Sequence, residues 1–407
     1  MTTPRDEIEQ LVAFEGRGPG TDAERRAANH LRGRVEALGR SATVEPTWIR
    51  PNWPLAYTAY ALFGVVASIA SIGSPVAGAI VAGVALVAAL GDLSGRVHTG
   101  RLLTGRRGSQ NVISPEESAR PGTLVLVAHY DAGRTGFVFG RLAALGRRIG
   151  PFRPIVVSLA LVLATAALRA GGGGTPAVEI VQFAATVVLI LAVPAFADIA
   201  LSGVVPGASG NASGVSTVLR LAERYGGDLE HFDVWVLLTG GEEAFGAGMR
   251  EWVRRHRAEL DPARTVFLNV DTVGSGTVRY TRREGALVPT RHHPRLVELC
   301  DQIAQEDAEE RRYGARPITI RSPGDSAAVR RAGFPAITIS CREPGGHAAN
   351  LRRHTDVPAA VDDAALDRAF GFCSELIELI DEAIGPDVSD HAAQEGSNRL
   401  SGLSSGV

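Results

Sequence analysis

Residues 233–248 read DVWVLLTGGEEAFGAG, and this stretch sets the fold class of the chain. Its first half is a short apolar run typical of a buried β-strand, and the run stops at two glycines. Two adjacent glutamates, Glu242 and Glu243, follow at once. Adjacent carboxylates repel each other, and the end of a buried strand is a costly place for either charge. The pair therefore indicates a site where something offsets the negative charge.

Strand-like and helix-like segments alternate along the polar part of the chain. Strands are expected at residues 123–129, 233–240, 265–271, 317–322 and 335–340, and helices at 21–39, 213–226, 247–260, 293–312, 325–333 and 363–383. Continuous apolar strands between helices predict an α/β fold, with a mainly parallel central sheet flanked by helices on both faces. Ligands collect at the carboxyl ends of the strands in such a sheet.

Two apolar regions interrupt this pattern. Residues 55–90 and 154–201 are almost free of charge, and a short turn rich in glycine and proline divides each of them. A helix needs roughly 20 apolar residues to cross a bilayer, and these segments are apolar on all sides. We therefore expect two inserted transmembrane hairpins. Two of the four segments are somewhat short, and four buried core helices are the alternative.

The domain organisation follows from these insertions. The polar domain is expected at residues 1–54, 94–153 and 202–385, the hairpins at 55–93 and 154–201, and a disordered polar tail at 386–407. Arginines flank the hairpins on the side of the polar domain, and positive flanks stay in the cytoplasm. The start of the chain has no apolar signal-peptide core. These patterns predict a multi-pass protein of the cell membrane with a cytoplasmic polar domain. The flanking arginines are Arg96, Arg101, Arg106, Arg107, Arg141, Arg147, Arg148 and Arg153.

Charge and cysteine content exclude other classes of protein. A net charge of −2 gives no electrostatic case for nucleic-acid binding. The sequence contains arginine but no lysine. This bias indicates a GC-rich bacterial genome. The cysteines Cys300, Cys341 and Cys373 form no C-x-x-C pair. They are expected to be buried, reduced thiols.

Side chains able to bind a metal follow the predicted strands. Each of these side chains alone is weak evidence for a metal site, because a lone histidine or aspartate at a strand end is commonly a structural or turn residue. Together, at one edge of one sheet, they would form a ligand set for zinc. A dication would also explain the paired glutamates, since one could be a ligand and the other a general base for the activated water. The candidates are His129, Asp131, Glu242, Glu243, Asp271, His347 and His354.

The polar part of the chain resembles metallopeptidase family 28 of the MH clan, which includes bacterial leucyl aminopeptidase and glutamate carboxypeptidase II. The matching stretches, in order, are GSQNVIS, LVLVAHYDAG, GASGNASGVSTVLRLA, TGGEEAFGAG, FLNVDTVG, GDSAAVRRAGFPAI and RHTD. The apolar hairpins lie outside this match. The resemblance implies a zinc-dependent exopeptidase, similar to an aminopeptidase, which hydrolyses peptide or amide substrates. The apolar hairpins add the expectation of a membrane anchor, with membrane lipid as the other partner.

The resemblance also implies a role for each candidate residue. Glu242 would be the general base, and Asp131 would orient a histidine ligand of the metal. The expected ligands are His129 and Asp271 for one zinc ion and Glu243 and His354 for the other, with His347 as the alternative to His354.

One departure from the family pattern concerns the carboxylate that bridges the two zinc ions. The family has a Gly-Ala-x-Asp-Asn-x-Ser-Gly stretch, whereas this chain keeps Asn211 and Ser213 but has Gly210 at the bridging position. Each ion would then have two protein ligands, whereas catalytic zinc sites usually have three. A hydroxide or water, or a neighbouring carboxylate such as Asp131, could bridge the two ions instead. Otherwise the affinity for zinc falls, and one ion binds or none.

The same departure leaves other functions open. A non-catalytic scaffold or binding protein on the membrane would keep the fold without the bridging carboxylate. Cyclisation of an N-terminal glutamine is a third possibility, since the same fold supports it. A second, smaller departure is the stretch GDSAA, which retains Asp325 with no assigned role.

Overall fold

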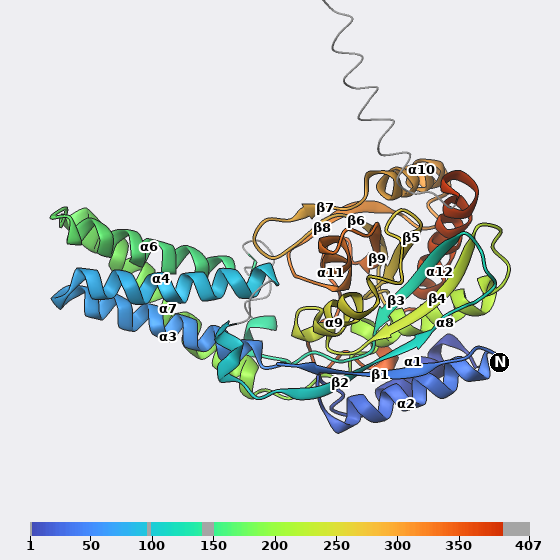
Figure 1. The fold of residues 1–407 in the computed structure, drawn as a ribbon, viewed down its shortest axis with the longest axis horizontal. Coiled ribbons are helices and arrows are strands. Elements are labelled where there is room, and N and C mark those ends of the chain that lie inside the picture. The colour runs from blue at the N-terminus through green and yellow to red at the C-terminus, as the bar shows by residue number, and fades with distance from the viewer. Residues whose placement is uncertain (1, 96–98, 141–149, 386–407) are drawn as a thin grey trace, which may run out of the picture.

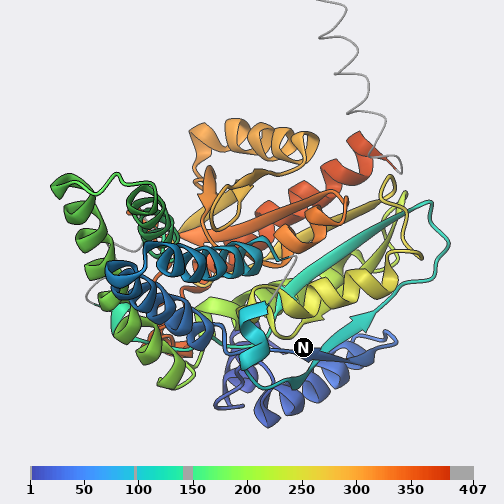
Figure 2. The ribbon, with the colours of Figure 1, turned by 60° about the vertical axis from the view of Figure 1, so that its left-hand side comes forward.

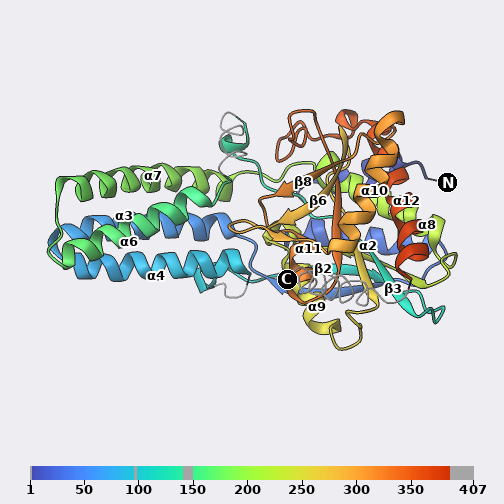
Figure 3. The ribbon, with the colours of Figure 1, turned by 90° about the horizontal axis from the view of Figure 1, so that it is seen from above.

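The computed structural model describes residues 2–95, 99–140 and 150–385. These residues form an α/β domain and a bundle of four long helices that projects from one side of it (Figure 1). The same two lobes are seen from above in Figure 3. The predicted basic flank residues Arg96, Arg141, Arg147 and Arg148 and the predicted tail at 386–407 lie outside the described residues.

One mixed sheet organises the α/β domain. The described strands are β1 (Thr43–Ile49), β2 (Arg107–Ser114), β3 (Gly122–His129), β4 (Phe232–Thr239), β5 (Thr265–Val270), β6 (Thr277–Glu284), β7 (Thr290–Arg291), β8 (Arg316–Ile320) and β9 (Ala336–Arg342). Their order is β1-β2-β4-β3-β5-β9-β6-β7, with β8 paired to β6. The central pairs β4–β3, β3–β5 and β5–β9 are parallel, whereas β1, β2, β6 and β7 are joined by antiparallel pairs.

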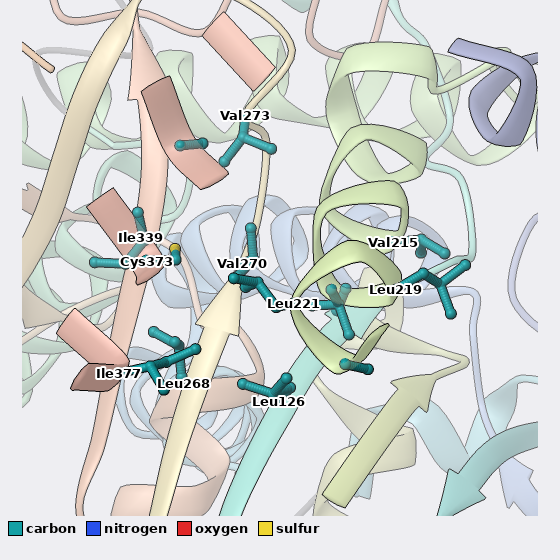
Figure 4. Close-up of a cluster of buried hydrophobic side chains, with 14 of the residues drawn as sticks. Leu126, Val215, Leu219, Leu221, Leu268, Val270, Val273, Ile339, Cys373 and Ile377 are labelled. Carbon is teal, nitrogen blue, oxygen red and sulfur yellow. The ribbon is translucent and has the colours of Figure 1, made fainter. Parts of the chain in front are cut away.

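Helices cover both faces of this sheet, as the sequence predicts. The side chains of β3 alternate, so that Leu124 and Leu126 belong to one core and Val125 and Val127 to the other. Figure 4 shows part of the larger core, in which Leu126 of β3 lies near Leu221 of a covering helix. The larger core is covered by α1 (Pro4–Val12), α2 (Asp22–Ala37), α8 (Ser213–Tyr225), α10 (Pro294–Glu310) and α12 (Asp363–Leu379), and the smaller by α9 (Ala247–His256) and α11 (Asp325–Arg331).

Several elements lie outside the sequence expectations. The strands β1, β2, β6 and β7 and the helix α1 have no counterpart among the predicted segments. β1 reads TVEPTWI, is an edge strand, and has only two fully buried positions, Thr47 and Ile49. Such strands lack the continuous apolar run that marks a buried parallel strand. The three cysteines are free and buried, as expected.

The four-helix bundle consists of two consecutive hairpins. These are α3 (Trp53–Gly73) with α4 (Pro75–Ser94), and α6 (Arg153–Ala170) with α7 (Pro176–Leu201). All four helices are long and apolar enough to cross a membrane. The two segments that looked short from sequence form helices of 20 and 18 residues. In Figure 2 the bundle comes forward from the sheet as a separate layer.

The helices of the bundle approach closely at small residues and share polar contacts in its interior. A Cβ added to Gly78 of α4 would lie 2.4 Å from Cβ of Ser71 on α3, so the two helices touch closely. Gln182 of α7 donates hydrogen bonds to the hydroxyls of Ser68 and Ser71 at 3.0 and 2.8 Å. Close approach through small residues and interhelical hydrogen bonds are typical of helices packed in a membrane.

Candidate active site

The carboxyl ends of three parallel strands meet at one edge of the sheet. β3 lies between β4 and β5. His129 is the last residue of β3, and Asp271 directly follows β5. Glu242 and Glu243 lie in a short 3-10 turn just after β4. The sheet order therefore brings together three segments, of which the first lies more than a hundred residues before the other two in sequence.

His129 lies between three carboxylates. Its Nε2 atom is 3.4 Å from Oδ1 of Asp271, and its Nδ1 atom is 3.4 Å from Oδ1 of Asp131 and 3.7 Å from Oε2 of Glu242. Burial opposes a charge on the imidazole, but the neighbouring carboxylates raise the pKa of His129 well above its ordinary value. A positive charge at this place is therefore strongly stabilised.

The turn with the two glutamates is held by Asp131. The carboxylate of Asp131 accepts hydrogen bonds from the backbone N–H groups of Glu242 and Glu243, both at 3.0 Å. Gly241 and Phe245 enclose the turn with φ of 66° and 69°, in the left-handed region. Burial, together with the charges of nearby carboxylates, raises the pKa of Glu242 well above its ordinary value. A carboxyl group with a raised pKa is suited to accept and return a proton near neutral pH.

Asp325 joins the same cluster. It begins α11, is fully enclosed, and accepts a hydrogen bond from the hydroxyl of Thr239 at the end of β4. Burial raises the pKa of Asp325 to about 7, while the charge of His129 opposes the rise. The sequence left this residue without a role, and the structure places it among the carboxylates around His129.

Glu243 pairs with an arginine that sequence reasoning missed. Arg352 donates a hydrogen bond to its carboxylate. The guanidinium lies over the rings of Trp53 and Phe139, at 5.9 and 5.2 Å from their centroids. Burial raises the pKa of Glu243, and Arg352 acts in the opposite direction. In the sequence, the only indication that Arg352 belongs to the site was its position directly before the RHTD stretch.

At the position of the expected bridging carboxylate, another aspartate approaches. The backbone N–H groups of Ser209 and Gly210 donate to the carboxylate of Asp356 at 2.7 and 3.1 Å. A Cβ added to Gly210 would lie 3.0 Å from Oδ2 of Asp356. Burial raises the pKa of Asp356 to about 6. Asn211 accepts a hydrogen bond from the buried Arg17 at 2.6 Å.

The histidines of the last loop are placed differently from the other candidates. His354 is exposed and His347 half-buried. A Cβ added to Gly203 would lie 3.8 Å from Cε1 of His354, which places this imidazole beside the segment that follows α7. In the described part of the chain, no hydrogen bond or ion pair joins either imidazole to Glu243. The role of His354 as a metal ligand stays a prediction.

The two halves of the expected zinc site differ in their fit to a metal. Two donors bound to one tetrahedral zinc ion lie about 3.3 Å apart, and Nε2 of His129 is 3.4 Å from Oδ1 of Asp271. These two side chains fit a single ion. The second half does not fit, because Glu243 is paired with Arg352 and residue 210 has no carboxylate. Across residues 2–95, 99–140 and 150–385, no three His, Cys, Asp or Glu side chains are grouped so that they could hold a metal.

The helical bundle holds the glutamate turn from outside. The indole N–H of Trp53 donates to the backbone carbonyl of Glu243 at 2.9 Å, and Arg101 donates to that of Ala244 at 3.0 Å. Phe245 belongs to the hydrophobic core of the bundle, with its ring centroid 5.1 Å from that of Trp53. The inserted helices therefore form part of the wall of the candidate site.

Comparison with known proteins identifies the type of domain. Residues 192–377 match a family model described as peptidase family M28. The resemblance to this family is confirmed. The match covers the strand ends that carry the two glutamates and Asp271. A search of curated proteins found no match.

Solved structures of the M28 type share the fold. A zinc-dependent exopeptidase from Parabacteroides distasonis superposes with a TM-score of 0.53 at 12% identity, over 93% of this chain and 97% of that one. A leucine aminopeptidase precursor from Bacteroides thetaiotaomicron gives 0.51 at 14%, over 92% and 95%. A glutaminyl cyclase from Tannerella forsythia gives 0.54 at 13%, over 92% and 97%. At these identities the likeness shows the fold, a zinc aminopeptidase-like α/β sheet.

Proposed function

We propose that this protein is a membrane-anchored hydrolase of peptide bonds, related to exopeptidases, that uses one zinc ion. The observation that carries the proposal is the placement of His129 and Asp271 at one strand edge, 3.4 Å apart, beside the buried carboxylate of Glu242. The M28 match and the fold shared with a zinc-dependent exopeptidase support the same function.

In this proposal each residue has a separate task. His129 and Asp271 would hold the ion, and a bound zinc ion would polarise the substrate carbonyl and activate a water for attack. Glu242 takes the proton of the attacking water on its carboxylate and delivers it to the leaving amine. Asp131 fixes the turn through the N–H groups of Glu242 and Glu243, so that the carboxylate of Glu242 stays beside His129.

The position at the membrane is part of the proposal. The four apolar helices would span the bilayer, and the α/β domain would lie on the cytoplasmic side, where Arg101, Arg106, Arg107 and Arg153 flank the helices. A Trp48→Cys variant tests on which side of the membrane the α/β domain lies, because Trp48 is exposed on β1. An impermeant maleimide should label this cysteine only after the cells are permeabilised.

The decisive measurement is the metal content of the purified full-length protein. We expect about one zinc per chain, together with hydrolysis of short peptides that chelators abolish and zinc restores. His129→Ala should lose both the metal and the activity. His256→Ala is a matched control, since His256 pairs with Glu45 and Glu259 away from this site. A peptide with an N-terminal glutamine belongs in the same assay, because a glutaminyl cyclase shares the fold.

A scaffold without catalysis is the competing function. Two observations favour it: the glycine at residue 210, and the pairing of Glu243 with Arg352 instead of with a second cation. A stably folded protein that purifies without metal, takes up no zinc and hydrolyses no peptide would establish the scaffold and refute the hydrolase.

A further inference from the structure

A cavity of about 140 Å³ lies beside Glu243, where the α/β domain meets the helical bundle. Trp53 at the start of α3, Glu243 and Arg352 line it. Two more arginines, Arg107 and Arg134, also line it. Neither has a task in the proposed hydrolysis, so their presence in this wall needs another explanation.

The backbone fixes both arginines at the cavity. Arg134 forms an isolated β-bridge with Val204, and its guanidinium donates to the carbonyl of Ser202 at 2.6 Å. Arg107 is the first residue of β2. Its stem lies against Gly20, where an added Cβ would be 2.5 Å from Cβ of Arg107 and where φ is +73°. The two side chains are therefore carried by different segments of the chain, which both line the cavity.

The charges in the cavity wall do not balance. Arg352 is offset by Glu243. Within the described ranges, neither Arg107 nor Arg134 forms an ion pair with a carboxylate. Burial lowers the pKa of Arg134, and the charge of Arg107 lowers it further, so the two guanidinium groups are near enough to repel each other. The wall thus carries two unpaired positive charges, an arrangement that favours a bound anion.

We propose that this cavity binds the free carboxylate of a short peptide, with Arg107 and Arg134 as the residues that determine this specificity. The proposal rests on the proposed function for the peptide nature of the ligand. A guanidinium matches the planar geometry of a carboxylate with paired N–H donors. A volume of about 140 Å³ accommodates one end of a peptide and not its whole length.

The charge of the cavity indicates the end of the substrate that is recognised. Glu243 lines the cavity and adjoins Glu242, whose carboxylate lies 3.7 Å from His129, so the cavity lies next to the turn that carries the proposed general base. The same positive wall repels the ammonium group of a peptide N-terminus. The exopeptidase would then act at the carboxyl end of short peptides, in contrast to the aminopeptidase-like preference expected from the sequence.

Binding can be measured without turnover. The full-length protein is placed in lipid nanodiscs with a chelator, and acetyl-Ala-Ala-Ala and its C-terminal amide are titrated calorimetrically. We expect the free acid to bind at least about tenfold more tightly, the usual effect of one charge-assisted hydrogen bond. Arg107→Gln and Arg134→Gln should each remove most of this preference and leave binding of the amide unchanged.

Matched variants keep the result interpretable. Arg106→Gln is the control, because Arg106 is exposed next to Arg107 and lies over the ring of Trp48 at 5.5 Å. Arg134→Lys should restore part of the preference. If Arg134→Gln fails to fold, Arg107→Gln decides alone, since its exposed side chain donates no hydrogen bond in the described structure.

Three outcomes would overturn the inference: equal binding of acid and amide, an equal loss in Arg106→Gln, or tighter binding of inorganic phosphate than of the peptide acid. The last would assign the cavity to phosphate groups, such as those of lipid headgroups. Hydrolysis of peptides without any acid preference would refute the cavity inference and leave the proposed function intact. A preference for the free acid without any hydrolysis would support the cavity inference and count against the proposed hydrolysis.

Discussion

Gly210 shows how one residue changes the chemistry available to the site. The backbone N–H groups of Ser209 and Gly210 hold the carboxylate of Asp356, so a negative charge already lies beside this position. Arg352 supplies the positive charge next to Glu243. In this chain, hydrogen bonds and a guanidinium stabilise carboxylates that a second cation would otherwise have to stabilise.

The variant Gly210→Asp tests this balance. Its new carboxylate would come close to Asp356, so we expect the metal-free protein to lose about 1–3 kcal/mol of stability. Zinc should bind more tightly than to the wild type, because the added carboxylate is a further ligand, and should restore the stability. Thermal unfolding with and without zinc, and calorimetric titration of the metal, measure both effects.

Gly210→Ala is the matched control for the bulk of the side chain. The backbone φ of Gly210 is not in the left-handed region, so an alanine is sterically possible there. Its Cβ would lie 3.0 Å from Oδ2 of Asp356, and Asp356 would have to shift slightly. If the alanine and aspartate variants lose the same stability and bind zinc equally, the charge argument is wrong.

At the scale of elements, the bundle and the glutamate turn are joined by a buried ion pair. Arg101 donates a hydrogen bond to Asp92 of α4 at 3.2 Å, its Nε lies 2.6 Å from the other carboxylate oxygen, and the side chain also donates to the carbonyl of Ala244. The guanidinium lies over the ring of Phe245, 4.4 Å from its centroid. One side chain therefore connects α4 to the turn that carries Glu242 and Glu243.

The variant Arg101→Met should separate these elements. Removing one partner of a buried ion pair typically costs about 3–5 kcal/mol, so a large drop in the unfolding temperature is expected. Arg106→Met changes an exposed arginine nearby and should leave stability unchanged. Peptide hydrolysis by Arg101→Met, measured below its unfolding temperature, should also fall, because the turn loses a contact. Full activity and stability would show that the contact is dispensable.

At the scale of the whole molecule, the bundle presents a large apolar surface. Leu62, Ile69, Ile72, Val84, Val87, Phe183 and Leu191 are among the exposed apolar side chains of the four helices. The bundle interior combines an apolar core with a few polar contacts, and its exterior is also apolar. A water-soluble bundle would have a polar exterior, so the apolar exterior of this bundle suits a lipid environment.

The variant Val87→Arg tests membrane insertion. Val87 of α4 is 70% exposed, and an arginine near the centre of a membrane-spanning helix costs about 3 kcal/mol on insertion scales. We expect less protein in alkali-resistant membrane fractions. Trp48→Arg is the control, since Trp48 is 64% exposed on β1 of the α/β domain and should not affect fractionation. Equal recovery of both variants from membranes would contradict the spanning orientation of α4.

The sequence by itself determined the central strands, most of the helices and the four apolar helices. Each of these is marked by a local signal, namely the apolar run or periodicity of the segment itself. The order of strands and helices also implied that His129, Glu242 and Asp271 lie at one sheet edge, because parallel strands end on the same side.

Only the tertiary structure decided which partner each of these residues has. Arg352 pairs with Glu243 across 109 positions, and Asp356 reaches Gly210 across 146. The outer strands β1 and β7 and the cavity between Trp53 and Arg134 likewise depend on how distant segments pack. Such contacts leave no periodic trace in the sequence, because they are set by the relative placement of finished elements and not by the local preferences that form them.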